Sequence, residues 1–214
     1  MSISLRALLL ATFLAIAASA QGQVNIVNFD FGAVPVQCSS WGFTYQGGQL
    51  NCNYPVTQNF DGSPGFGWKM GSTIATAGSP SNTGAGVAAP DAFICPPSFD
   101  GMPFHQAALL QNVGSFVWQA VGGFNPGSYT LSFYLGSRCP AGWWDGEQTV
   151  VALIDGVTIG TWNLTNSAPF TLQTANFSVS TGGTHIVEFM GMKAGDHTAF
   201  LSYVTIGPGG GSGH

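Results

Sequence analysis

The chain has 214 residues, of which nine are acidic and four basic, so 6% are charged against about a quarter in an ordinary globular domain. Because 45% of the residues are hydrophobic and 13% aromatic, the composition excludes intrinsic disorder, which requires low hydrophobicity and high net charge. Four basic residues are too few to form a patch that neutralises phosphates, so nucleic acid is excluded as a partner.

The first 20 residues predict a secretory signal peptide. The segment MSISLRALLLATFLAIAASA has Arg6 before an apolar run and ends on Ala18-Ser19-Ala20, which predicts cleavage before Gln21. The apolar run is too short to cross about 30 Å of hydrocarbon, and no later stretch is apolar enough to do so. We therefore predict a secreted protein, extracellular or periplasmic, with no membrane span in the mature form.

All four cysteines follow this segment. In an exported chain an even number of cysteines predicts disulfides, here two with three possible connectivities. Cys38 and Cys52 flank a short Gly-rich, aromatic stretch, so a local bridge is the simplest pairing and leaves Cys95 for Cys139. The rival interpretation is a zinc site, but the sequence lacks Cys-x-x-Cys spacing.

Short segments of alternating hydrophobicity, separated by Gly, Pro, Asn and Asp, run along the mature chain and predict strands. The expected strands are Val24–Phe31, Trp68–Thr76, Ala107–Leu110, Ser115–Val121, Ser128–Arg138, Gln148–Ile154, Val157–Asn163, Phe170–Val179, His185–Met190 and Thr198–Ile206. Asp155-Gly156 predicts a two-residue type I′ hairpin, which needs positive φ at both positions. The small, polar tract 77–89 predicts a flexible surface loop.

So many short antiparallel strands predict a single all-β domain, an antiparallel jelly-roll β-sandwich over residues 21–206. The Gly-rich tail 207–214 has no side chains that could pack and is expected to be disordered. Trp118 and Trp162 stand at strand periodicity, so both are expected in the core.

Five segments resemble a known family. They are QNVGSFVWQAVGGFNPGSYTLSFYLGSR (Gln111–Arg138), VVALIDG (Val150–Gly156), PFTLQTANFSVSTGGTHIVEFMG (Pro169–Gly191), GDHTAFLSYVTI (Gly195–Ile206) and the opening VNFDFGAVPV (Val27–Val36). They are similar to secreted galactose-binding-like β-sandwiches, the bacterial relatives of plant cell-wall proteins of that fold, close to carbohydrate-binding modules of families four and nine. The resemblance covers nearly the whole mature chain and implies a non-catalytic, extracytoplasmic jelly roll without fixing its ligand.

The last strand departs from that family. It reads FLSYV over Phe200–Val204 where relatives carry paired acids, one of which often helps to hold a structural calcium ion. Asp30 and Asp196 remain as side-chain ligands, and calcium needs six to eight oxygens. We predict no cofactor and no metal site, and a structural calcium ion stays an open alternative.

The sequence offers little for catalysis. Asp145 and Glu147 are two residues apart, but they lie in the turn-like stretch AGWWDGEQ, and glycoside hydrolysis needs two carboxylates across a scissile bond. No G-x-S-x-G motif marks a nucleophile. We predict that the protein is not an enzyme and has no catalytic residue.

Binding is better supported, because sugars present apolar faces to aromatic rings and hydroxyls to planar polar groups. The stretch RCPAGWWD (138–145) offers both kinds, and a bridged Cys139 would pin it. Strand alternation puts Tyr134 on the same face as Arg138. The predicted ligand-binding residues are Tyr134, Arg138, Trp143, Trp144 and Asp145. Alternatively, Arg138 pairs with a structural acid such as Glu188.

The sequence therefore predicts a secreted, non-catalytic protein that binds a polysaccharide or cell-surface glycan. The alternative, from another class, is a structural or adhesive extracellular matrix protein that self-associates through its weakly charged surface. Concentration-dependent light scattering separates the two hypotheses, because reversible self-assembly without glycan binding favours the second.

Overall fold

The computed structural model describes residues 24–34, 43–45, 63–73, 84–89, 97–140 and 145–209. The described residues form eleven strands and no helix that could cross a membrane. The strands are β1 (Phe43–Tyr45), β2 (Lys69–Ser72), β3 (Ala85–Ala88), β4 (Ala107–Gln111), β5 (Ser115–Phe124), β6 (Gly127–Ser137), β7 (Thr149–Ile154), β8 (Val157–Asn163), β9 (Thr171–Val179), β10 (Gly183–Gly191) and β11 (Thr198–Pro208).

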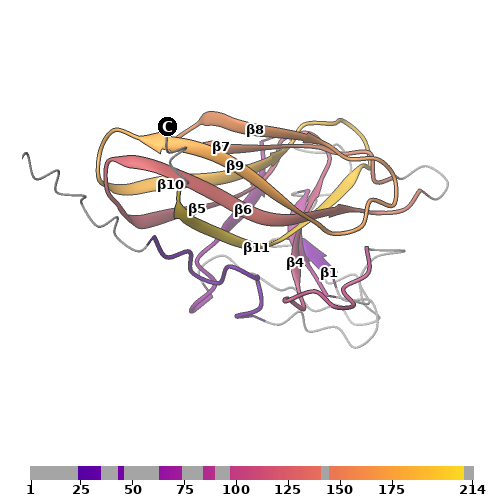
Figure 1. Ribbon diagram of the computed structural model, residues 1–214. Helices are drawn as coiled ribbons and strands as arrows, with labels where there is room; N and C mark the ends of the chain where they lie inside the picture. Colours follow the sequence, from indigo (N-terminus) through magenta and orange to yellow (C-terminus); the bar gives the residue numbers. More distant parts are fainter. Residues whose placement is uncertain are drawn as a thin grey trace, which may run out of the picture.

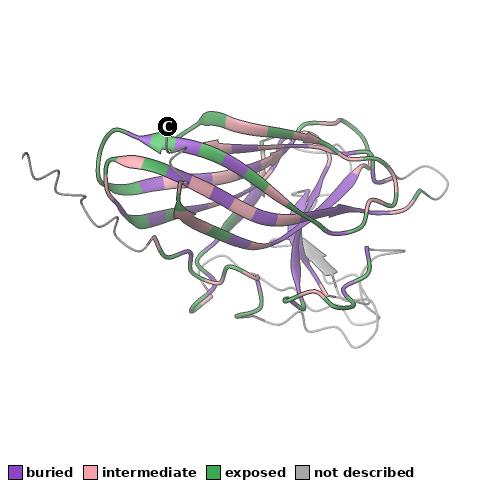
Figure 2. Cartoon of the chain, in the orientation of Figure 1, coloured by how far each residue is buried: buried purple, intermediate pink, exposed green. Residues whose placement is uncertain are grey.

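The strands form two antiparallel sheets packed face to face, as Figure 1 shows. One sheet has six strands in the order β1-β3-β4-β11-β6-β9, and the other has five in the order β2-β5-β10-β7-β8. Buried and more exposed residues alternate along β5, β6, β7 and β10 (Figure 2), so each of these strands sends one set of side chains into the core between the sheets. The predicted antiparallel jelly-roll sandwich is confirmed.

Strand prediction succeeds best in the C-terminal half. β8 has the predicted bounds, and the hairpin before it turns at Asp155 and Gly156, with φ of 49° and 79°. These positive values are those that a type I′ turn requires. β11 continues past the predicted end of the domain to Pro208, and the Gly209 amide donates to the carbonyl of Ser128.

Two predictions in the N-terminal half are wrong. Residues 24–31 form no strand: 24–26 are irregular and 27–30 form a turn, because Asn28 and Phe31 have φ of 53° and 59°, which breaks an extended backbone. The tract 77–89 was expected to be a surface loop, yet β3 lies within it and is wholly buried between β1 and β4. Its Ala and Gly residues suit a strand that is covered on both faces.

The N-terminal segment 24–34 is fixed to the sandwich by side-chain amides. Gln119 of β5 accepts from the Val27 amide at 2.8 Å and donates to the Val27 carbonyl at 2.9 Å, as a paired strand would. Gln106 donates to the carbonyl of Phe31 at 2.6 Å. Because Gln119 takes an inward position, Trp118 points to the outer face of the five-stranded sheet, and its predicted place in the core is wrong. Trp162 packs edge-on against Phe133 at the core, as expected.

A second apolar cluster lies on the outer face of the six-stranded sheet. Phe99 and Phe104, from the segment after residue 97, pack over Leu109, Phe200 and Phe170. Gly136 makes room for this layer, because a Cβ there would lie 3.2 Å from the Phe170 ring. One end of this outer face is therefore covered, and the other end is open.

Some predictions concern residues beyond those described. Cys139 is disulfide-bonded, but Cys38, Cys52 and Cys95 lie outside the described residues, so the pairing stays a prediction. The signal peptide (1–20) and most of the tail lie outside them as well.

Candidate functional site

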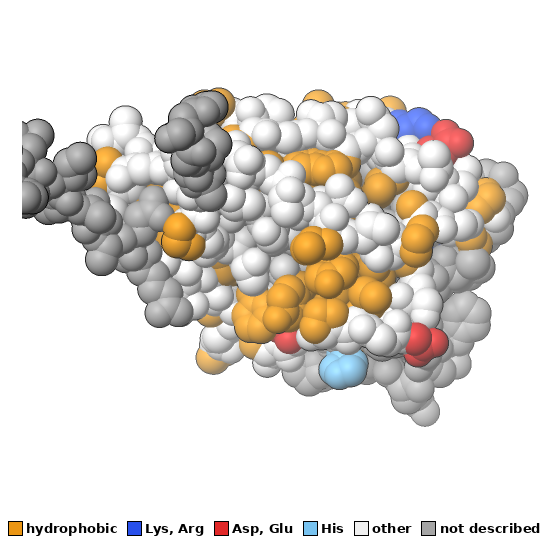
Figure 3. Space-filling model, viewed as in Figure 1, with side chains coloured by type: hydrophobic (Ala, Val, Ile, Leu, Met, Phe, Trp, Pro, Cys, Tyr) orange, Lys and Arg blue, Asp and Glu red, His pale blue; other side chains and the backbone are white. Residues whose placement is uncertain are grey.

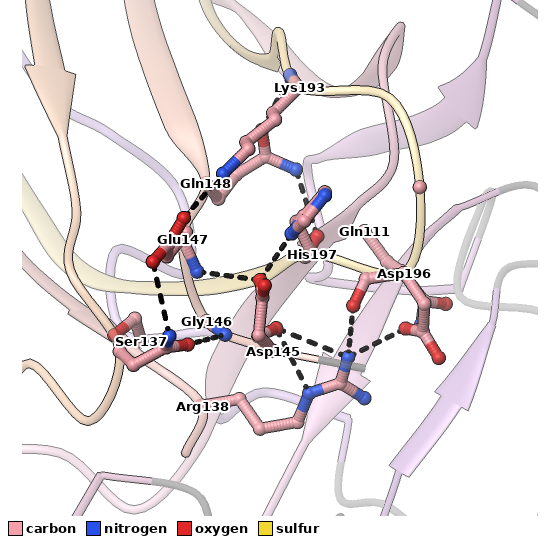
Figure 4. Close-up of polar contacts among 12 residues, drawn as sticks. Gln111, Ser137, Arg138, Asp145, Gly146, Glu147, Gln148, Lys193, Asp196 and His197 are labelled. Atoms are coloured by element: carbon pink, nitrogen blue, oxygen red, sulfur yellow. Dashed lines mark hydrogen bonds and ion pairs between the residues drawn. The ribbon is translucent and has the colours of Figure 1, made fainter. Parts of the chain in front are cut away.

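Arg138, the residue after β6, holds three chain segments together. It is only 1% exposed, and its guanidinium donates to the backbone oxygens of Asp145 at 3.2 Å and Asp196 at 2.5 Å. It also forms an ion pair with the Asp196 carboxylate at 2.6 Å, and that carboxylate accepts a further hydrogen bond from Gln111 (Figure 4). The buried charge is therefore compensated by a carboxylate and by carbonyls.

Asp145 is bound to the chain before β11 through both backbone and side chain. Its amide donates to the Asp196 carbonyl at 3.0 Å, and its carbonyl accepts from the Thr198 amide at 3.1 Å. Its carboxylate pairs with Nδ1 of His197 (Figure 4). Burial acts to raise the pKa of Asp145, but hydrogen bonds from His197 and the Glu147 amide outweigh it and hold the pKa below its ordinary value. Asp145 is therefore ionised at neutral pH.

The structure brings together only part of the predicted site. Arg138 and Asp145 are in contact. The sequence places Arg138 on the same polar face as Tyr134, as a ligand-binding residue, but the side chain is buried and its guanidinium is bonded to Asp145 and Asp196. Its acidic partner is Asp196 and not Glu188, which lies on the outer face of the other sheet. Trp143 and Trp144 lie outside the described residues, so their role stays a prediction.

Neither acid considered for calcium is grouped with others in the described parts of the chain. Asp30 accepts from the Gly32 amide at 3.0 Å, and Asp196 is engaged by Arg138. The described residues contain no group of three or more His, Cys, Asp and Glu side chains that could hold a metal ion. The described residues thus give structural calcium no support, and it stays an open alternative for the rest of the chain.

Tyr134 belongs to a row of aromatic rings on the outer face of the six-stranded sheet. Its ring lies 6.1 Å from that of Tyr203 and 5.5 Å from that of Phe104. Tyr203 continues the row to Phe29, with ring centroids 5.0 Å apart. Phe29 is 38% exposed, and Leu172, opposite Tyr134 on β9, is 56% exposed. Figure 3 shows a continuous hydrophobic area on this side of the molecule.

Tyr203 reaches this face through a β-bulge. The register of β11 against β6 shifts between Ser202 and Thr205, and Tyr203 has a φ of 54°. Regular alternation from the inward Leu201 would point Tyr203 into the core, but the bulge gives that place to Val204. A residue with φ > 0 at such a bulge is usually glycine. Tyr203 therefore has a strained backbone, and the same bulge exposes its ring on the outer face of the sheet.

Beyond the aromatic row, the same face carries only neutral polar side chains. Ser132 follows Tyr134, with Thr174 and Thr205 as its neighbours across the strands. Thr130 then donates to Asn176 at 2.8 Å. No residue of β6, β9 or β11 carries a charge. The face therefore joins half-exposed aromatic rings to uncharged hydrogen-bonding groups.

No protein-family model and no curated protein matches the chain. Several solved structures resemble it at the level of the fold. A cyclase from Fischerella sp. TAU, in complex with an indolyl butanone, is 14% identical with a TM-score of 0.54, and the match covers 86% of this chain and 96% of the cyclase. The shared architecture is an antiparallel β-sandwich.

Two further structures match less of the chain. The K1 cleaved adhesin domain of Lys-gingipain from Porphyromonas gingivalis is 13% identical with a TM-score of 0.48, covering 72% of this chain and 97% of that domain. A family 35 carbohydrate-binding module from Clostridium thermocellum is 10% identical with a TM-score of 0.42, covering 66% and 98%. At these identities the likeness concerns the fold alone, and the fold hosts different activities.

Sequence reasoning missed Phe29 and Tyr203. Phe29 lies in the segment that was expected to be a strand, and its exposure follows from the turns around it. The exposure of Tyr203 follows from the bulge, for which the sequence AFLSYVTI carries no glycine as a signal. Tyr134 alone links the predicted site to the aromatic row.

Proposed function

We propose that this protein is a secreted, non-catalytic carbohydrate-binding protein, and that the glycan lies on the outer face of the six-stranded sheet. The observation that carries the proposal is the half-exposed row of Phe29, Tyr203 and Tyr134 beside an uncharged ladder of hydroxyl and amide groups. The comparison structures are too dissimilar in sequence to indicate a ligand, so they do not enter the choice of one.

The chemistry of this face suits a neutral polysaccharide. Aromatic rings bury the apolar C–H faces of sugars, while Thr174, Asn176 and Ser178 on β9 are exposed and offer donors and acceptors to hydroxyls. A charged glycan would find no counter-charge on β6, β9 or β11. Selectivity for uncharged or weakly charged chains follows.

Two acids close to Arg138 in sequence, Asp145 and Glu147, support a non-catalytic role. Asp145 is paired with His197, and Glu147 accepts from Lys193 at 2.7 Å and from Asn166 at 3.3 Å. Both carboxylates hold chain segments together, and hydrogen bonds hold the pKa of Asp145 below its ordinary value, whereas a glycosidase needs one carboxyl with a raised pKa. We propose that Trp143 and Trp144, which lie outside the described residues, extend the binding surface.

The test is a glycan array followed by affinity electrophoresis on soluble neutral polysaccharides, with the chain from Gln21 onward. Tyr134→Ala and Tyr203→Gly each remove one ring of the row, and glycine suits the positive φ at position 203. We expect each change to weaken retention about tenfold, the effect of losing roughly 1.4 kcal/mol.

A double variant, Trp143→Ala/Trp144→Ala, separates the sheet face from the loop. Val157→Ser, at a 67% exposed position of β8, serves as a matched surface control. If the wild type binds no glycan, the proposed function is wrong. If only the tryptophan variant loses binding, the glycan binds at the loop and the sheet-face site is wrong.

A further inference from the structure

The outer face of the five-stranded sheet is unusually apolar. Antiparallel sheets normally turn polar residues toward water, but here the outward positions of three adjacent strands carry large hydrophobic side chains. They are Phe116 and Trp118 on β5, Ile186 and Met190 on β10, and Val151 and Leu153 on β7, all half-buried. None of them belongs to either buried core or packs against one. An apolar area of this kind marks an interaction surface.

One acid and one base lie within this face, in a single row across the sheet. Lys69 of β2 pairs in register with Trp118 of β5, Trp118 with Glu188 of β10, and Glu188 with Leu153 of β7. Met70 and Val187 point into the core, so alternation turns Lys69 and Glu188 outward. The order across the row is thus base, tryptophan, acid and leucine.

We infer that two copies of this chain pack through these faces, with a two-fold axis that runs along β5. Rotation about such an axis sets Trp118 against its symmetry mate and exchanges the two flanking strands. Lys69 of one copy then faces Glu188 of the other, twice in each dimer. Packed sheets lie about 10 Å apart, a separation that Lys and Glu side chains span together.

The composition of the face favours a second copy over a glycan. Its branched aliphatic side chains resemble a sandwich interior, and the natural partner of an apolar sheet face is another one. Homodimers with two-fold symmetry need such self-complementary patches. A neutral sugar carries no charge to neutralise Glu188 or Lys69, whereas a second copy supplies an opposite charge for each.

Glu188 needs a cation in such an interface. Burial already raises the pKa of its carboxyl, so its charge is poorly solvated before association. β5 and β7 contain no titratable residue to face it, and His185 of its own strand is buried and bonded to Asp155. Lys69, one strand beyond Trp118, is the charge on the same row.

The dimer would turn the two six-stranded sheets outward in opposite directions. Two glycan faces would then act together, so that a dimer could bridge two polysaccharide chains or gain avidity on one surface. The dimer itself does not depend on the proposed glycan binding, and the two can fail separately.

The test is sedimentation velocity of the mature protein over a concentration series, without glycan. We expect reversible dimerisation that Trp118→Ser abolishes, with circular dichroism unchanged. Glu188→Lys and Lys69→Glu are each expected to weaken the dimer at least tenfold, and the double variant Glu188→Lys/Lys69→Glu to restore it. The double variant keeps the test decisive even if Trp118→Ser fails to fold.

Leu172→Ser is the matched control, because it removes an exposed apolar side chain from the opposite sheet. A wild type that is monomeric at every concentration overturns the inference, as does a dimer that both charge reversals leave intact. Loss of the dimer in Leu172→Ser but not in Trp118→Ser would assign association to the aromatic row. Failure of the double variant to recover would refute the axis along β5.

Discussion

Replacing Arg138 by methionine is expected to destabilise the protein strongly. Methionine retains an unbranched apolar stem, but it removes the guanidinium that donates to Asp145 and Asp196. Arg138 is 1% exposed and the Asp196 side chain 19% exposed, so the change leaves a poorly solvated carboxylate without its cation. Breaking a buried pair from one side costs about 3–5 kcal/mol.

That loss is a large part of the 5–15 kcal/mol by which domains are usually stable. At about 2–4 °C per kcal/mol for a domain of this size, the melting temperature should fall by roughly 6–20 °C. The free energy of unfolding is measured by chemical denaturation, followed by tryptophan fluorescence. Removing both charges, in Arg138→Met/Asp196→Asn, should recover part of the loss, because no carboxylate is left behind.

The reasoning fails if Arg138→Met costs less than about 1 kcal/mol, the scale of an exposed ion pair. It also fails if the double variant loses more free energy of unfolding than the losses of the two single variants added together. This double-mutant cycle isolates the coupling between Arg138 and Asp196. Lys193→Met is the control, since Lys193 forms a comparable but exposed ion pair with Glu147.

Three further predictions concern stability. Gly160→Ala should cost about 1–3 kcal/mol in chemical denaturation, because a Cβ there would lie 2.3 Å from the Trp162 ring. Tyr203→Ala should be less stable than Tyr203→Gly by about 1 kcal/mol, because both lose the ring but only alanine keeps the strain of a positive φ. Thermal stability should be highest between about pH 4 and 6.5 and fall on both sides. The hydrogen bond to Asp155 raises the pKa of His185 above 6.5, so that contribution is lost as pH rises through the raised value. Burial acts to raise the pKa of Asp155, but the hydrogen bonds from His185 and the Ile186 amide, together with the attraction of His185, lower it below 3.8, so that contribution is lost as pH falls.

Each of these has an outcome that would contradict it. Thr161→Ala, at an exposed neighbouring position, should be near neutral, and an equal loss there would deny the steric argument for Gly160. Tyr203→Ala as stable as Tyr203→Gly would remove the claim of strain. His185→Asn should flatten the alkaline side of the pH profile, and an unchanged profile would show that other groups govern it.

The sequence predicts the regular half of the fold well because local signals agree there with tertiary structure. Asp155-Gly156 sets the turn between β7 and β8 and the pairing next to it, up to the register shift between Ala152 and Leu153, and alternation identifies the inward side of β6. Prediction fails where side chains replace backbone pairing: Gln119 takes an inward position to bond Val27, and this turns Trp118 outward. It also fails where small residues form a buried strand, as in β3.

For the candidate site, the sequence locates Tyr134 but not its neighbours. The bulge at Tyr203 depends on the register between β11 and β6, which local sequence does not encode. Arg138 attracts attention in the sequence because basic residues are so few. Its structural role depends on Asp196, which is distant in sequence. Long-range contacts of this kind decide which face a side chain joins.

The attachment of the N-terminal segment has a consequence for biosynthesis. The Val204 amide donates to the Phe29 carbonyl, and Ser202 contacts the Asp30 carbonyl across 172 residues of sequence. Segment 24–34 therefore depends on the last strand, β11, for hydrogen bonds to the carbonyls of Phe29 and Asp30. Long loops must close before these contacts form, which slows folding. Until β11 has been synthesised, a nascent chain cannot form the contacts of Phe29 and Asp30.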